Sequence, residues 1–207
     1  MTSVSTGIYF MRIAILTFEG FNEIDSFVAL NLLGRVRRPN WQAHIASPTE
    51  TVQSVNGLRI HAQQPLEYAN EADVVLIGSG RYTRSIIEDR TLMSRLQLNP
   101  SKQLIGSQCS GALMLAKLGL LDSMPACTDS RTKPFLAATN VTVLQKPFHC
   151  EGNIATAGGC LSAHYLATWV ITRALGREAA EEALRYIVPV GEEQQYIARA
   201  MSVVGAA

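Results

Sequence analysis

Cys109 stands where a nucleophile is expected in this sequence. It follows the apolar run Leu104–Ser107 and precedes the strong helix formers Ala112–Ala116. A residue on a tight turn between a buried strand and a helix projects its side chain above the carboxyl edge of the sheet, where ligands bind in open α/β folds. The free N–H groups and positive dipole end of the following helix favour an anion, so we expect a thiol that is partly or wholly thiolate. The alternative interpretation is that Cys109 is only a small buried hydrophobic residue.

A glycine-rich turn is the second candidate for chemistry. Gly78-Ser79-Gly80 follows the apolar run Val74–Ile77, so its backbone N–H groups are expected near the same sheet edge. Together with the Ser110 N–H, they would form an oxyanion hole for charge that develops on a substrate. The alternative is that this turn only makes a tight connection.

The elements that must position these residues alternate along the chain. Short apolar runs, typical of strands buried on both faces of a parallel sheet, are separated by segments of helical period. Right-handed crossovers between them predict a doubly wound, mostly parallel sheet with helices on both faces. The expected strands are Ile13–Thr17, Ala43–Ser47, Val74–Ile77 and Leu104–Ser107, with short β-like pieces at Ala126–Asp129, Val141–Leu144 and Ile154–Thr156. The expected helices are Asp25–Leu33, Thr83–Gln97, Leu161–Leu175, Arg177–Tyr186 and Glu193–Met201.

The composition fits one domain that binds small molecules. A chain of 207 residues with 47% hydrophobic and 17% charged residues ordinarily folds as one compact unit, and we place it at 11–207, with Met1–Phe10 as an extension. The 18 basic and 17 acidic residues are interspersed, which argues against nucleic acid and against an acidic membrane surface as partners. No apolar run approaches the roughly 20 residues of a membrane span, and the start lacks the pattern of a signal peptide, so we expect a cytoplasmic protein.

The remaining cysteines point to neither disulfides nor metal. Cys127, Cys150 and Cys160 form no C-x-x-C pair with one another or with Cys109, and the chain is long enough to fold without covalent links. We therefore expect reduced thiols, no metal site, and these three residues as core.

The sequence around Cys109 resembles the ThiJ/PfpI superfamily. Ser107-Gln108-Cys109-Ser110-Gly111-Ala112, continued through Gly119-Leu120-Leu121, is similar to the nucleophile region of that superfamily. The start Arg12–Phe18, the turn after Val74–Ile77 and the stretch Gly152–Gly159 follow in the same order and spacing. The resemblance covers Met11–Tyr186 and implies a flavodoxin-like, class I glutamine amidotransferase-like fold. It also implies a homodimer, with the site near the interface.

Within the superfamily, the run Phe18–Asp25 most resembles isonitrile hydratases, in which an acid that begins the first helix faces the cysteine. Asp25 matches that acid. A carboxyl beside the sulfur can stabilise a thiolate by hydrogen bonding, pass a proton and activate water. The structural alternative is a capping box, with Asn22 as N-cap and Asp25 three residues later.

Two positions depart from the pattern of the superfamily. Peptidase-like members have a histidine directly after the cysteine, whereas this chain has Ser110, so a protease would lack its base. Hydratase-like relatives carry a Thr-His or similar pair where this chain has Cys127-Thr128-Asp129-Ser130, which makes Asp129 and Thr128 candidate pocket residues. The histidines, interpreted as structural or surface groups, are His44, His61, His149 and His164.

Three functions follow from these residues. The first is a cofactor-independent, cysteine-dependent hydratase or lyase that converts an isonitrile to an N-substituted formamide through Cys109 and Asp25. The second is glyoxalase or deglycase chemistry, in which the same sulfur attacks an α-oxoaldehyde. The third is a non-catalytic sensor that is oxidised at Cys109 or binds a metabolite. Whether His149 and Glu151 of one subunit reach the pocket of another stays open.

Overall fold

The structure is a computed structural model that describes residues 10–206 and has a seven-stranded sheet at its centre. The strand order is β5-β2-β1-β6-β7-β9-β8, and every neighbouring pair is parallel except β8 with β9. The strands are β1 Met11–Leu16, β2 Trp41–Ser47, β5 Gln64–Pro65, β6 Val74–Ile77, β7 Leu104–Gln108, β8 Phe148–Glu151 and β9 Ile154–Ala157. A separate antiparallel hairpin is formed by β3 Thr51–Gln53 and β4 Arg59–His61.

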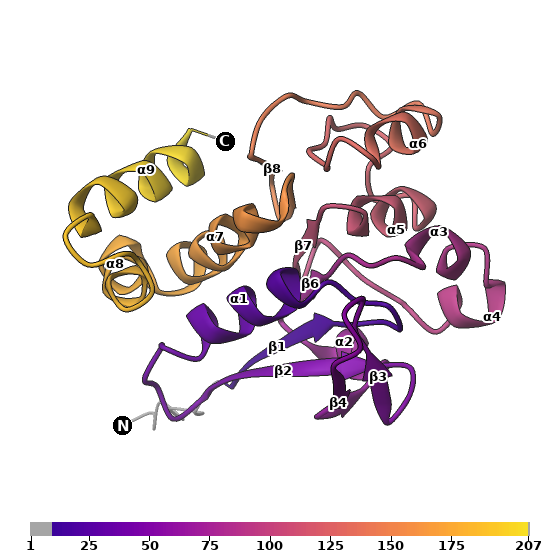
Figure 1. Ribbon diagram of the computed structural model, residues 1–207, viewed down its shortest axis with the longest axis horizontal. Coiled ribbons are helices and arrows are strands. Elements are labelled where there is room, and N and C mark those ends of the chain that lie inside the picture. The colour runs from indigo at the N-terminus through magenta and orange to yellow at the C-terminus, as the bar shows by residue number, and fades with distance from the viewer. Residues whose placement is uncertain (1–9, 207) are drawn as a thin grey trace, which may run out of the picture.

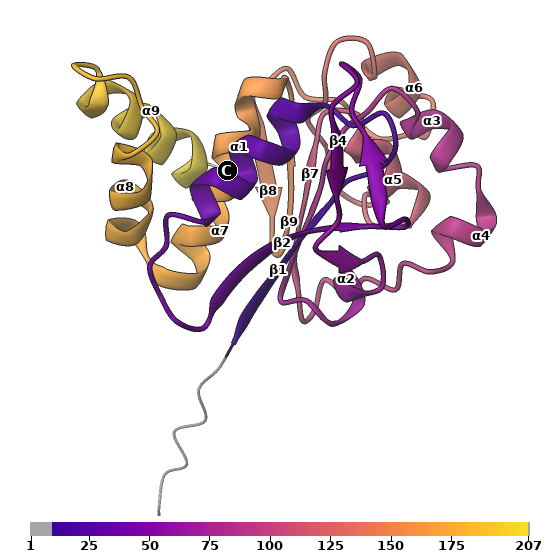
Figure 2. The same cartoon turned by 60° about the horizontal axis from the view of Figure 1, so that its bottom comes forward.

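Helices cover both faces of this sheet, as Figure 1 and Figure 2 show. One layer contains α1 Glu23–Leu33, α7 Ala163–Leu175, α8 Arg177–Arg185 and α9 Glu193–Gly205. The other contains α2 Tyr68–Glu71, α3 Thr83–Ile86, α4 Arg90–Met93, α5 Gly111–Lys117 and α6 Lys133–Ala137. A 3-10 turn, Cys160–Ser162, leads into α7. The predicted fold class, a single doubly wound domain, is confirmed.

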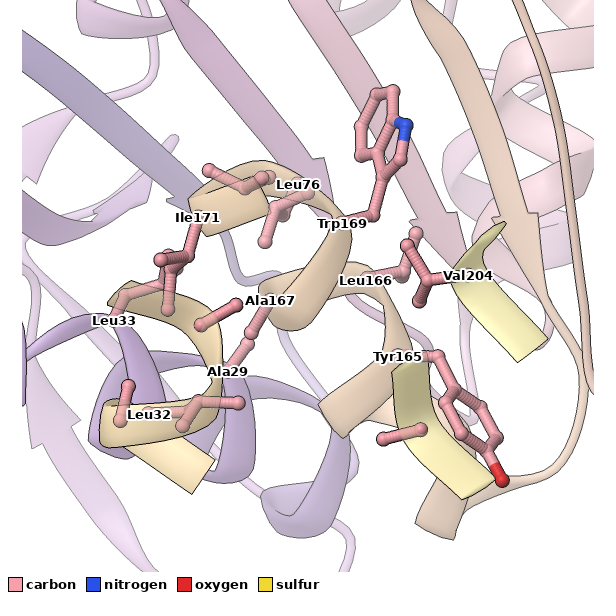
Figure 3. Packing of buried hydrophobic residues seen from close by; sticks show 14 of the residues in the cluster. Ala29, Leu32, Leu33, Leu76, Tyr165, Leu166, Ala167, Trp169, Ile171 and Val204 are labelled. Atoms are coloured by element: carbon pink, nitrogen blue, oxygen red, sulfur yellow. The ribbon is translucent and has the colours of Figure 1, made fainter. Parts of the chain in front are cut away.

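Alternation along the strands supplies both layers with apolar surface. Ile13 and Ile15 of β1 belong to the core under α1 and α7, whereas Ala14 and Leu16 belong to the core under α5. Successive side chains of a strand point to opposite faces, so a continuous apolar run is what a sheet covered on both sides requires. In Figure 3, Leu33 of α1 lies beside the α7 side chains in the first of these cores.

The structure differs from the predicted elements in several places. The expected helix Thr83–Gln97 is two short helices, because Asp89 adopts an extended conformation and caps α4 by accepting from the Leu92 N–H at 2.9 Å. The pieces 126–129 and 141–144 meet in one isolated bridge, between Ala126 and Val143, rather than in strands. Strands β3, β4, β5 and β8 were not predicted, since each is at most four residues long and, unlike β6, none is a continuous apolar run.

Other expectations fall partly outside the described residues. Of the predicted extension Met1–Phe10, only Phe10 is described. Within 10–206, no helix is long and apolar enough to cross a membrane.

The register of the sheet brings four strand ends together. Leu16 pairs with Ile77, Ile77 with Ser107, and Ser107 with Thr156, so the carboxyl ends of β1, β6, β7 and β9 are adjacent. The loops that follow these strands therefore meet at one edge of the sheet. These loops, together with the first turn of α1 and the 3-10 turn, carry the Gly78-Ser79-Gly80 turn, Cys109, Asp25 and Cys160.

Candidate active site

Cys109 lies on a strained turn between β7 and α5. Its φ angle is 47°, in the left-handed region that residues with a side chain rarely adopt. Its N–H donates to the Ala157 carbonyl at 2.9 Å, which continues the pairing of β7 with β9 for one more residue. A side chain at Gly111 would place Cβ 2.6 Å from the Ile77 carbonyl oxygen, so only glycine lets α5 begin so close to β6. This is the strand-to-helix elbow that the sequence predicts.

Asp25 is buried in the first turn of α1, with 2% of its surface exposed. Asn22 caps this helix by accepting from the Ile24 N–H at 3.3 Å, as a capping box predicts. A capping box does not explain the burial of Asp25. The Ser79 hydroxyl donates to Oδ2 of Asp25, and Oδ1 has no hydrogen-bond partner within residues 10–206. Burial raises the pKa of Asp25 to about 6, although the hydrogen bond from Ser79 lowers it.

Cys160 joins this pair, and its interpretation as core is wrong. A carboxylate oxygen of Asp25 and the sulfurs of Cys109 and Cys160 all lie within 4.8 Å of one another. The Asn22 side-chain N–H donates to the Cys160 sulfur at 2.9 Å. The sequence held a signal for this position, because Cys160 comes directly after Gly158-Gly159, which follows the predicted strand 154–156.

The same three side chains are the group in the described chain that could hold a metal ion. Two thiolates and a carboxylate would suit Zn²⁺, with one position left for water or substrate. The prediction of no metal site stays a prediction.

The surroundings of Cys109 oppose the predicted thiolate, which stays a prediction. Burial raises the pKa of Cys109, and the neighbouring acidic groups of Asp25, Cys160 and Asp129 raise it further. Helix α5 has only seven residues, and the Gln108 side-chain N–H approaches the sulfur no closer than 3.6 Å. Because burial favours the protonated form of the thiol, a carboxylate at Asp25 is placed to accept its proton.

The proposed oxyanion hole is smaller than predicted. The Gly78 N–H donates to the Leu16 carbonyl at 3.0 Å, and the Gly80 N–H donates to the Ser110 hydroxyl at 3.3 Å, so both are used in the fold. The Ser110 hydroxyl also lies 2.9 Å from that of Thr83. Within the described chain, the N–H groups of Ser79 and Ser110 have no acceptor. These two remain available for a ligand.

A pocket of about 640 Å³ opens over Cys109 and Cys160. This volume is in the range of small-molecule sites. Asp129 lines it, as predicted, although its Oδ1 also accepts from the backbone N–H groups of Arg131 and Thr132. Thr128 is not among the lining residues, because its hydroxyl donates to the Cys109 carbonyl at 2.8 Å.

No histidine of residues 10–206 lines this pocket. His149 lies 3.0 Å from Glu151 on β8, and His164 is held by the Leu161 carbonyl at the start of α7. The site is therefore a cysteine–carboxylate site, as the sequence indicated, with a second thiol added.

Comparisons with known proteins agree on the fold. The family model described as DJ-1/PfpI family matches residues 11–173. A ThiJ/PfpI family protein from Pseudomonas syringae is similar over 99% of this chain and 95% of its own, with 16% identity and a TM-score of 0.76. Drosophila melanogaster DJ-1beta is similar over 84% of this chain and 96% of its own, with 21% identity and a TM-score of 0.74. Schizosaccharomyces pombe DJ-1 is similar over 86% of this chain and all of its own, with 14% identity and a TM-score of 0.73. No curated protein matches the sequence.

Proposed function

This chain belongs to the DJ-1/PfpI family. On that basis, we propose that it is a cysteine-dependent enzyme. We propose further that it hydrates an isonitrile to an N-substituted formamide. The supporting observation is the contact of Asp25 with Cys109 under an open pocket, within 4.8 Å. Burial favours the protonated form of the Cys109 thiol, and the Asp25 carboxylate is the neighbouring base, so nucleophile and base are adjacent before substrate enters.

In the first step, the Cys109 sulfur bonds to the terminal carbon of the isonitrile while its proton passes to Asp25. Asp25 then returns the proton to the same carbon, so the thiol has added across that carbon and the product is a thioimidate. One carboxyl group serves as base and then as acid, which suits a group whose pKa is raised to about 6.

In the second step, water gives a proton to Asp25 as its oxygen adds to the thioimidate carbon, and Asp25 passes this proton to the nitrogen. The tetrahedral intermediate then expels the sulfur, which takes up the remaining hydroxyl proton by way of Asp25, and the N-substituted formamide leaves. The net reaction consumes one isonitrile and one water. The free N–H groups of Ser79 and Ser110 are available for the oxygen on which negative charge develops.

The test is turnover of a panel of alkyl and aryl isonitriles and of methylglyoxal by the parent protein and two variants. Cys109→Ala is expected to lower isonitrile turnover by at least about 10³-fold. Cys127→Ala is the matched control, because Cys127 is also fully buried but is absent from the pocket. Isonitrile turnover that survives Cys109→Ala would refute the mechanism. Turnover of methylglyoxal without turnover of any isonitrile would assign oxoaldehyde chemistry instead.

A redox sensor is the second candidate, and the nearness of Cys160 to Cys109 favours it. Hydrogen peroxide would oxidise one thiol to a sulfenic acid, and the other thiol would displace water from it, leaving a disulfide and two waters from peroxide. Burial raises the pKa of both thiols, which slows the first step because the thiolate is the reactive form. A disulfide between Cys109 and Cys160 at low peroxide, in a protein without turnover, would support this candidate.

A further inference from the structure

The outer wall of the pocket is cationic. Arg81, Arg84 and Arg131 line it, and Asp129 is the acidic side chain among the described lining residues. One carboxylate oxygen of Asp129 is already bound by two backbone N–H groups. Three positive charges therefore line the pocket, against Asp129 on its wall and the buried Asp25 carboxyl group beside Cys109.

The three arginines lack carboxylate partners. The ion pairs among residues 10–206 use Arg12, Arg95, Lys117, His149 and Arg177 as cations, and none of them involves Arg81, Arg84 or Arg131. The Arg84 guanidinium lies over the Phe135 ring, 4.3 Å from its centroid. Such stacking orients the planar guanidinium but leaves its charge and its N–H donors available.

The arginines also come from separate segments. Arg81 follows the Gly78-Ser79-Gly80 turn, Arg84 lies on α3, and Arg131 precedes α6. The contact of Arg84 with Phe135 joins the α3 side of the pocket to the α6 side. Cys109 lines the same pocket and is buried, whereas the three arginines are exposed, so the arginines lie on the solvent side of the pocket.

We propose that the substrate carries an anionic group, a carboxylate or a phosphate, which Arg81, Arg84 and Arg131 bind while Cys109 attacks an electrophilic carbon elsewhere in the same molecule. This inference rests on the proposed role of Cys109 as nucleophile. Guanidinium groups bind carboxylate and phosphate oxygens through paired N–H donors, and several around one pocket raise the local concentration of an anion. The reactive substrate is then an isonitrile with an acid group rather than a neutral one.

Two alkylating reagents that differ in charge test the inference. The rates of Cys109 alkylation by anionic iodoacetate and neutral iodoacetamide are measured at one pH and ionic strength by peptide mapping. Their ratio is divided by the same ratio for N-acetylcysteinamide, a neutral free thiol. The thiolate fraction of Cys109 affects both reagents equally and cancels. We expect a normalised ratio of about ten or more, corresponding to about tenfold preferential binding of the anion.

Variants locate the effect. The triple substitution Arg81→Gln, Arg84→Gln and Arg131→Gln is expected to bring the normalised ratio to about one. Arg90→Gln is the matched control, since Arg90 is exposed on α4 but does not line the pocket, and it should leave the ratio unchanged. The three pocket arginines are exposed, so the triple variant is expected to fold, which circular dichroism verifies.

Each outcome has a distinct meaning. A parent ratio of about one, with Cys109 still alkylated by iodoacetamide, overturns the anionic substrate but leaves the nucleophile intact. If neither reagent modifies Cys109, the proposed nucleophile fails, and the arginine site is judged by thermal unfolding with inorganic phosphate and with propionate. A rise in Tm in the parent that is lost in the triple variant supports the site and shows which anion it takes. Equal shifts in both proteins, or none, overturn it.

Discussion

Helix α1 takes part in two regions that are equally buried but differ in chemistry. At one end, Leu32 and Leu33 are fully buried in the apolar contact with α7 that Figure 3 shows. At the other end, Asp25 is 2% exposed, with an unpartnered oxygen beside the strained Cys109. Burial stabilises the fold in the first region and costs free energy in the second. The packing of the rest of the chain therefore holds the site in an unfavourable state.

The largest effect is expected on turnover when the carboxyl at this site is removed. Asp25→Asn should lower kcat/KM by about 10² to 10⁴-fold, because the thiol loses its base. In the parent, kcat/KM should rise with pH through an apparent pKa of about 6, as Asp25 loses its proton, and this rise should vanish in the variant. Steady-state kinetics between pH 4.5 and 8 measure both. An unchanged rise in the variant would assign the titration to another group.

The next effect is on stability, in the apolar region. Ile171 is fully buried in the core that α1 and α7 share, so Ile171→Ala should lower the free energy of unfolding by about 2 to 5 kcal/mol. The rate of Cys109 alkylation in the folded protein should not change. Urea unfolding measures the change in stability, and the rate of Cys109 alkylation at low urea shows whether the site is affected. If alkylation changes as much as stability does, the two regions are not separate.

The smallest expected effect is a gain in stability, in contrast to the loss expected for Ile171→Ala. The pKa of Asp25 is raised from 3.8 to about 6 by burial, so the folded protein holds this proton in a pH range where the unfolded chain has released it. The parent should therefore lose stability relative to Asp25→Asn as pH rises through this range. At pH 7 the variant should be more stable than the parent, by at most about 3 kcal/mol. At pH 3 the difference should disappear.

Chemical unfolding of both proteins at pH 3, 5 and 7 gives this difference directly. Comparing the two proteins at each pH cancels the titration of all other groups. A variant that is less stable than the parent at pH 7 would mean that the Ser79 hydrogen bond outweighs the cost of burying the charge.

The sequence predicted the features that depend on local patterns. The apolar runs gave the central strands, and the junction of Leu104–Ser107 with Ala112–Ala116 gave the elbow at Cys109. The role of Asp25 was predicted from the resemblance to isonitrile hydratases, and in the structure Asp25 lies near Cys109. Cys160 was missed because the position of the strand before it was not predicted. The sequence indicated a short β-like piece at 154–156 but not that it pairs with β7.

Features that depend on distant contacts could not be predicted. The raised pKa of Cys109 follows from its burial and from the nearness of Asp25 on α1, which is distant in sequence. The cationic wall needs Arg84 and Arg131 to face one pocket, and nothing in the spacing of these two residues indicates that. Hydrogen bonds also decide which N–H groups of the glycine-rich turn stay free, as Gly78 shows.

The four paired strand ends have a consequence for engineering the protein. Leu16, Ile77, Ser107 and Thr156 are locked in register across the sheet, so the floor of the pocket tolerates little displacement. Its outer wall is built from α3 and α6, which have four and five residues. Short surface segments accept exchange more readily than paired strands do. Substrate scope can therefore be redesigned by grafting new segments onto the wall, with the reacting groups kept in place as a reusable module.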